Sequence, residues 1–191
     1  GSPLSNDVWA GTLTEDKTKD VGCRLVWEQM PEAPWTPRAG FCVVDHQLRQ
    51  EDYLAENSTE ADSALTTEYM YVIGGLAHPL PGDDGTRSRN DVWRSVNGTY
   101  WEQVLPQSGK AMPWGARSFH SCATLQIGNS TATPRIYITG GGYMGRKGNN
   151  EVYDLEAYTD AWWSYDGSDW ARINYEEGSI HKSNLFSTNE W

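Results

Sequence analysis

Short runs of apolar residues alternate with polar and glycine-containing segments along this chain of 191 residues. The clearest runs, 69–73 and 135–139, are rich in β-branched and aromatic residues, and a pair of glycines follows each of them. Runs of this length and composition are typical of β-strands. No apolar run approaches the roughly 18 residues that a membrane-spanning helix needs. The pattern therefore predicts an all-β protein without direct membrane insertion.

Four motifs recur along the chain, which is the signature of a repeat architecture. They are a Pro-Trp-x-x-Arg stretch, an apolar run before a glycine pair, an Asp-x-Trp stretch, and a second tryptophan after it. The first lies at 34–38 and 113–117, the second at 69–75 and 135–141, the third at 7–9, 91–93 and 160–162, and the fourth at Trp27, Trp101 and Trp170. The chain thus holds two complete copies of the repeat and one partial copy.

Each complete copy predicts four consecutive strands, which we denote A to D. Strand A follows the arginine, strand B is the run before the glycine pair, strand C is the Asp-x-Trp stretch, and strand D begins at the second tryptophan. The pairs Asn97-Gly98 and Asp166-Gly167, which join C to D, are strong signals for a tight hairpin. Four short antiparallel strands in each repeat are typical of a β-propeller blade.

The repeated residues resemble the kelch family of β-propellers, from Asn6 to about Asn174. The resemblance rests on the arginine strand at 117–121, the glycine pairs, and the galactose-oxidase-like hairpin Asp-Val-Trp-x-Ser-x-Asp-Gly-x-x-Trp, seen at 91–101 and 160–170. Phe41 departs from the family pattern, which has a histidine at that place. The resemblance implies kelch-type blades of four antiparallel strands, about two and a half of them in this chain.

The repeat divides the chain into parts of one propeller domain. Residues 1–34 hold the remnant of a purification tag and a C–D half blade, and 35–105 hold a full blade with an acidic insertion at 45–68. A second full blade spans 106–177, and 178–191 form a tail or the start of the next blade. Because a closed propeller has roughly 4–8 blades, the sequence predicts a partial propeller that a companion chain, a proteolytic partner or further sequence completes.

Charge and sequons indicate where such a protein acts. The net charge of −11 argues against nucleic acid as a partner, because phosphate backbones are bound by clustered lysine and arginine. Three Asn-x-Ser/Thr sequons, at Asn57, Asn97 and Asn129, lie in polar segments that join A to B or C to D. They indicate a glycoprotein of the secretory pathway that is secreted or exposed on the cell surface.

The three cysteines, Cys23, Cys42 and Cys122, allow one internal disulfide at most. Cys42 and Cys122 lie in equivalent strands but one register apart, so we expect them to point to opposite sides of their sheets. Cys23 lies just before strand D of the half blade, and Cys42 lies in the strand A that follows. The candidate disulfide is therefore Cys23–Cys42, and the odd cysteine is a free thiol or has a partner outside the chain.

The face that carries the B–C and D–A connections, here called the loop face, holds the candidate binding site. By the resemblance, kelch proteins bind peptides there through residues that follow the glycine pair and the strand A arginine, which points to Ala39, Leu76, Ser118, Tyr143 and their neighbours. The candidate binding residues are His78, Arg87, Arg89, Ser118, Tyr143, Arg146 and Lys147. Loops on a rigid scaffold are where binding residues concentrate.

Other chemistry receives little support from the sequence. The glycines at 140, 142 and 145 match a dinucleotide-binding string, but no helical pattern follows them to meet a pyrophosphate. We expect no cofactor, no metal site and no catalytic residue. The repeated tryptophans, the strand A arginines Arg38 and Arg117, and His120 are expected to be structural, with the arginines and His120 satisfied by hydrogen bonds.

The leading hypothesis is a non-catalytic extracellular module that binds a protein or peptide partner through the loop face. Two alternatives stay open. Kelch-like propellers also include copper-radical sugar oxidases, whose Tyr, His and Cys ligands come from several blades, so the first alternative is a fragment of such a secreted enzyme. The second alternative is a lectin that binds a glycan.

Overall fold

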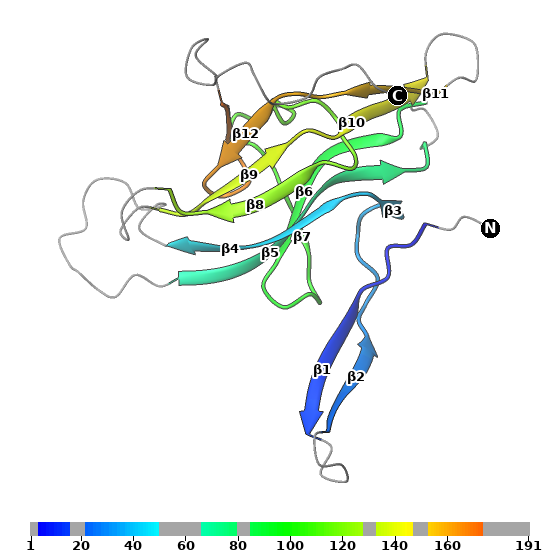
Figure 1. The fold of residues 1–191 in the computed structure, drawn as a ribbon, viewed down its shortest axis with the longest axis vertical. Helices are drawn as coiled ribbons and strands as arrows, with labels where there is room; N and C mark the ends of the chain where they lie inside the picture. Colours follow the sequence, from blue (N-terminus) through cyan, green and yellow to red (C-terminus); the bar gives the residue numbers. More distant parts are fainter. Residues whose placement is uncertain are drawn as a thin grey trace, which may run out of the picture.

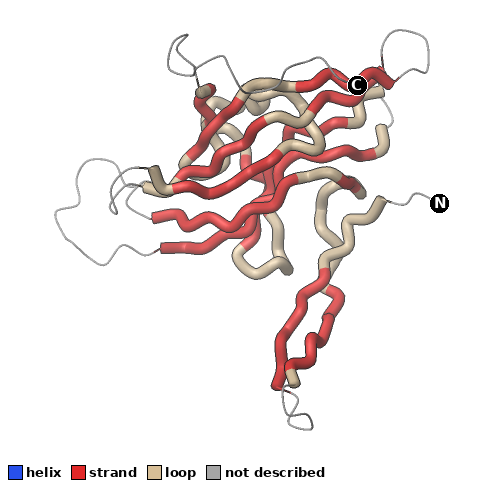
Figure 2. Tube along the Cα trace, in the orientation of Figure 1, coloured by secondary structure: helices blue, strands red, loops and turns tan. Residues whose placement is uncertain are grey.

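The computed structural model describes residues 4–15, 22–49, 66–79, 85–127, 133–146 and 153–173. In these ranges every regular element is a β-strand, and the strands pair antiparallel, so the all-β prediction is confirmed (Figure 2). Across the same ranges, no helical segment has the length and hydropathy needed to span a bilayer.

Two antiparallel meanders form the body of the protein (Figure 1). The first meander consists of β4 (Cys42–Arg49), β5 (Thr66–Ala77), β6 (Ser88–Ser95) and β7 (Glu102–Val104), and the short β3 (Arg38–Ala39) pairs with the far end of β5. The second meander consists of β8 (Ser121–Leu125), β9 (Arg135–Thr139), β12 (Ala161–Ser164) and β13 (Trp170–Arg172). Both follow the A-to-D order expected from the repeat.

The two meanders also share one register. Cys42 lies opposite Ile73 in the first, as Ser121 lies opposite Thr139 in the second. Strands B and C match in the same way, because Val72 faces Trp93 and Ile138 faces Trp162. Equivalent residues are therefore Arg38 and Arg117, Gly40 and Phe119, Phe41 and His120, Cys42 and Ser121, Val43 and Cys122, and Val72 and Ile138.

Two hairpins accompany the meanders. The N-terminal hairpin, β1 (Trp9–Glu15) and β2 (Cys23–Gln29), projects away from them (Figure 1). The other hairpin, β10 (Gly142–Arg146) and β11 (Tyr153–Ala157), lies within the segment that the sequence predicts as a B–C loop, so that part of the loop is a paired ribbon. Strands also extend into both ends of the predicted acidic insertion, to Arg49 and from Thr66.

The main apolar core lies between the two meanders. It combines Tyr71, Ile73 and Val92 of the first with Ile136 and Ile138 of the second, all fully buried. The contributing strand B residues are odd-numbered in the first meander and even-numbered in the second, and position 72 is equivalent to 138. The meanders therefore stack through opposite faces of equivalent sheets. The described residues do not close a ring of sheets, so the kelch-type propeller stays a proposal.

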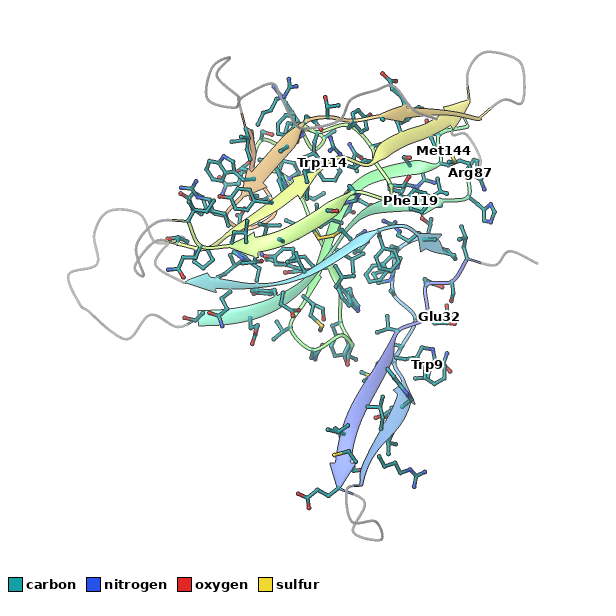
Figure 3. All side chains as sticks on the ribbon, viewed as in Figure 1. Trp9, Glu32, Arg87, Trp114, Phe119 and Met144 are labelled. Atoms are coloured by element: carbon teal, nitrogen blue, oxygen red, sulfur yellow. A yellow bond between two sulfur atoms is a disulfide. The ribbon has the colours of Figure 1, made fainter. Side chains whose placement is uncertain are left out.

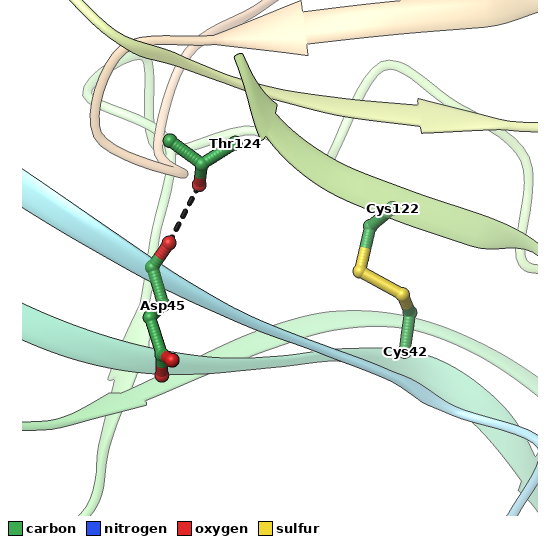
Figure 4. The surroundings of a disulfide bond; sticks show 4 residues. All are labelled: Cys42, Asp45, Cys122 and Thr124. Atoms are coloured by element: carbon green, nitrogen blue, oxygen red, sulfur yellow. Dashed lines mark hydrogen bonds between the residues drawn. A yellow bond between two sulfur atoms is a disulfide. The ribbon is translucent and has the colours of Figure 1, made fainter.

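The disulfide joins Cys42 to Cys122 across this stack, with the Cα atoms 6.0 Å apart, beside a hydrogen bond that the Thr124 hydroxyl donates to the Asp45 carbonyl at 2.6 Å (Figure 4). The predicted Cys23–Cys42 disulfide is wrong, because Cys23 is an exposed free cysteine on the projecting hairpin. Cys42 and Cys122 do lie on opposite faces of equivalent sheets, as their register offset predicts. Residues on opposite faces of equivalent sheets point away from each other within one repeat, but they meet when neighbouring repeats stack.

Candidate binding surface

A buried arginine begins strand A of each meander and ties three parts of the repeat together. Arg38 donates a hydrogen bond to the Gly74 carbonyl at 3.0 Å and forms a bidentate pair with the Asp91 carboxylate. The ion-pair distances are 2.6 Å for Arg38–Asp91 and 2.9 Å for Arg117–Asp160. Since Arg117 also donates to the Gly140 carbonyl at 3.1 Å, the expectation that these arginines satisfy strand-end carbonyls is confirmed.

Strand A of the second meander crosses closely under the glycine pair. The backbones of Ser118 and Gly142 exchange two hydrogen bonds, of 2.9 and 3.0 Å. Gly141 lies between them with a φ of +74°, and a Cβ atom there would come within 2.6 Å of the Ser118 carbonyl oxygen. Only glycine fits this crossing, which explains why the pair follows strand B in the sequence.

The same crossing joins the start of β6 to the β10–β11 hairpin. The Ser88 hydroxyl accepts a hydrogen bond from the Met144 amide at 2.8 Å, and the Arg87 amide donates to the Met144 carbonyl at 2.9 Å. Ser88 and Ser118 are both fully buried, with their hydroxyls 3.4 Å apart. Residues from three separate stretches of the chain therefore form one end of the stacked meanders.

The structure brings several predicted binding residues to this end. The guanidinium of Arg87 lies 3.4 Å from Nδ1 of His78, and that of Arg89 donates to the His78 carbonyl at 2.9 Å. The Tyr143 hydroxyl lies 2.9 Å from that of Thr86, just before this arginine pair. The loop-face cluster consists of His78, Thr86, Arg87, Arg89 and Tyr143.

The remaining predicted site residues have other positions. The side chain of Ser118 is fully buried behind the surface, where it supports the crossing. Arg146 is the last residue of β10, and Lys147 lies outside the described residues. Among the sequons, Asn97 is exposed in the C–D hairpin, where its side-chain oxygen accepts hydrogen bonds from the Thr99 and Tyr100 amides. Asn57 and Asn129 lie outside the described residues.

Phe119 is a surface residue that the sequence reasoning missed. Its side chain is 63% exposed, and its φ of +58° is the only positive value of a non-glycine residue among those described. The equivalent residue Gly40 has nearly the same φ, +59°. The Phe119 amide donates to the Gly40 carbonyl at 2.7 Å, and its ring lies against Gly40. The signal was present, since one repeat has phenylalanine where the other has glycine.

His120 is buried as expected, but the prediction that it is hydrogen-bonded is wrong. Neither ring nitrogen has a hydrogen-bond partner among the described residues. The ring lies against Gly74 of the first repeat, and the Cβ atom lies against Gly141 of the second. Burial, together with the positive charge of Arg117, lowers the pKa of His120 from 6.5 to about 4. The ring is therefore held in its neutral form in the folded protein.

This histidine predicts a loss of stability in mild acid. Unfolding returns the His120 pKa to about 6.5, so stability is complete above that pH and falls as the pH drops toward 4. The shift corresponds to about 3 kcal/mol. Urea denaturation at several pH values measures this fall, and His120→Gln, which does not titrate, should reduce it. An unchanged pH profile in the variant would contradict the assignment.

Within the described ranges, no group of three or more His, Cys, Asp or Glu side chains lies close enough to hold a metal ion. An open depression of about 530 Å³, lined by Asp45, residues 66–70 and Val96, includes none of the predicted binding residues. No protein-family model, curated protein or solved structure matches the chain.

Proposed function

We propose that this chain is part of a kelch-type β-propeller of the secretory pathway and serves as a non-catalytic module that binds a protein partner through the loop face. The repeated A-to-D meanders in one register support the propeller assignment. The Cys42–Cys122 disulfide is consistent with an extracellular protein, because such bonds persist in oxidising compartments. The three sequons support the same location.

Phe119 carries the proposal for binding. A bulky residue in the left-handed region costs about 1–3 kcal/mol, and such strain concentrates at functional sites. Gly40 supplies the strain-free alternative in the other repeat, so glycine fits this backbone. An exposed aromatic ring kept at such a position favours a contact role, since aromatic side chains dominate the binding energy of many interfaces.

The surroundings of Phe119 define the chemistry of the partner. Phe119 follows Ser118, whose hydroxyl lies 3.4 Å from that of Ser88. Next to Ser88, the positively charged side chains of Arg87 and Arg89 both contact His78. Figure 3 places Phe119, Arg87 and Met144 at the same end of the meanders. We therefore expect a peptide segment with an apolar anchor flanked by carboxylates, which the arginines attract.

Phe119→Gly is expected to weaken partner binding without lowering stability. The probe is a set of peptides selected from a phage-displayed random library on the immobilised protein. Their dissociation constants should rise at least about tenfold in the variant. The free energy of unfolding should stay equal or rise by up to about 1 kcal/mol, because the greater freedom of glycine in the unfolded chain offsets part of the relieved strain. Tyr100→Ala removes an even more exposed ring in the C–D hairpin and should not affect binding.

Peptide selection, copper analysis and a glycan array on the same protein distinguish the three proposed function classes. If no peptide is selected, or if the selected peptides bind Phe119→Gly as tightly as the wild type, the loop-face proposal is wrong. Bound copper with carbohydrate oxidation would instead support the oxidase alternative, and hits on a glycan array would support a lectin.

A further inference from the structure

The N-terminal hairpin repeats a structure that occurs twice elsewhere in the chain. Trp9 lies opposite Gln29 in this hairpin, just as Trp93 lies opposite Gln103 and Trp162 opposite Arg172. In each case the second residue stands two positions after the strand D tryptophan. β1 and β2 are therefore strands C and D of a third unit, and the two meanders show what normally surrounds such a pair.

The first missing neighbour is a cation. Asp91 and Asp160, which begin strand C in the meanders, each pair with a buried arginine from strand A. Their carboxylates also accept a hydrogen bond from the indole of the tryptophan two residues later, at 2.8 and 2.7 Å. The equivalent Asp7 is exposed, and no arginine or lysine among the described residues pairs with its carboxylate.

The second missing neighbour is a tryptophan. In the first meander Trp35 packs edge-on against both Trp93 and Trp101, with ring centroids 5.8 and 4.7 Å away. In the hairpin the equivalents, Trp9 and Trp27, are 52% and 59% exposed. The register places Leu13 and Leu25 on the same face as these rings, and both leucines are exposed as well. Figure 3 shows Trp9 on the projecting hairpin, away from the meanders.

The third missing neighbour is a strand pair. β6 lies between β5 and β7, and β12 lies between β9 and β13, whereas among the described strands β1 pairs only with β2. Part of the face of the first meander that points away from the second meander is also exposed. Val43 is 54% exposed, although its equivalent, Cys122, faces the neighbouring meander through the disulfide.

We propose that the N-terminal hairpin binds a strand A–strand B unit that the described residues do not supply. Its strand B, an apolar β-branched run that ends at a glycine pair, adds antiparallel to the free edge of β1. By analogy with Ile73 opposite Val92, the residue before the glycine pair lies opposite Val8. An arginine of strand A pairs with Asp7, and the tryptophan three residues before it packs on Trp9 and Trp27.

The structure favours a further strand A–strand B segment over a second copy of the described chain. Both described A–B units are already paired with their own C strands, β5 with β6 and β9 with β12, so the described part of a second copy has none to spare. The inference rests on the internal repeat. It is independent of loop-face binding, because Phe119 lies where the two meanders meet and not on the N-terminal hairpin.

A peptide with the sequence of residues 113–141 of this chain and Cys122→Val tests the proposal. It contains Trp114, Arg117, an apolar strand and the glycine pair. We expect saturable binding in isothermal titration, with protection of β1 amides in hydrogen exchange. Asp7→Asn in the protein, or Arg117→Ala in the peptide, should weaken binding at least about tenfold, and the combination should weaken it little further. Glu28→Gln, on the other face of the hairpin, is the matched control.

A fused version removes the dependence on peptide folding. A copy of residues 113–157 placed directly before Ser5 keeps the spacing to Asp7 that the second repeat has to Asp160. This fusion should raise the melting temperature and shield Trp9 and Trp27 from acrylamide quenching, and Asp7→Asn should cancel both effects. The proposal is overturned if neither the peptide binds nor the fusion stabilises, if Glu28→Gln acts like Asp7→Asn, or if the chain alone dimerises through Trp9 and Trp27.

Discussion

Replacing Arg117 with alanine is expected to lower the free energy of unfolding by about 3–5 kcal/mol, the usual cost of removing one partner of a buried ion pair. The Arg117 side chain is 0% exposed and that of Asp160 is 14% exposed. The substitution leaves this carboxylate without its main partner. It also removes the donor to the Gly115 and Gly140 carbonyls, at 3.2 and 3.1 Å.

The guanidinium of Arg117 contributes packing as well as charge. Its central carbon lies 4.5 Å from the ring centroid of Tyr158 and 5.8 Å from that of Trp114. Burial raises the pKa of the Asp160 carboxyl, but hydrogen bonds from Arg117 and Trp162 outweigh burial and hold that pKa below its usual value. In Arg117→Ala the Asp160 pKa should therefore rise, which NMR titration measures alongside chemical denaturation.

Glu102→Gln supplies the control for an ion pair with an exposed partner, because it leaves the packing of Arg94 over the Tyr69 ring in place. Arg94 and Glu102 are 2.6 Å apart, but their side chains are 21% and 62% exposed. Exposed pairs contribute about 0–1 kcal/mol. Comparable losses of unfolding free energy in the two variants would show that Arg117 does not hold strands A, B and C together as its contacts indicate.

The strand pattern and its turn signals were sufficient to predict the repeat unit. Asp-x-Trp and the second tryptophan mark strands C and D, and the glycine pair marks the end of strand B. The glycine pair is informative because the close crossing of strand A excludes a Cβ atom at Gly141. Local requirements of this kind are visible in one repeat, and they were met in both meanders.

Contacts between repeats were harder to predict. The Cys42–Cys122 bond, the packing of His120 and the strained Phe119 all depend on how one sheet stacks on the next. The sequence of a single repeat does not show which face of its sheet meets the neighbouring repeat. The register offset of the two cysteines was therefore taken to keep them apart, whereas it brings them together in the stack. The loop-face cluster depends in the same way on the β10–β11 hairpin, whose connecting segment, 147–152, is longer than the two-residue turns that mark a hairpin in a sequence.

The equivalences between the two meanders now supply the residues for a test of the disulfide. Ser121 stands where Cys42 does in the other repeat, and Val43 stands where Cys122 does. The double substitution Cys42→Ser and Cys122→Val therefore uses side chains that this fold already accommodates. Since the bond closes a loop with a sequence separation of 80 residues, the variant should lose about 2–5 kcal/mol of unfolding free energy.

Reduction provides the matching measurement. Dithiothreitol should lower the denaturant midpoint of the wild type toward that of the double variant and leave the variant unchanged, because only the wild type has a bond to lose. Cys23→Ser should behave as wild type in both conditions, since Cys23 is exposed and unpaired. A lower denaturant midpoint for Cys23→Ser than for the wild type, or a Cys23–Cys42 peptide in a non-reducing map, would refute the Cys42–Cys122 pairing. The bond links strands A of the two repeats, whose meanders share one apolar core, so its loss should lower the stability of both meanders together.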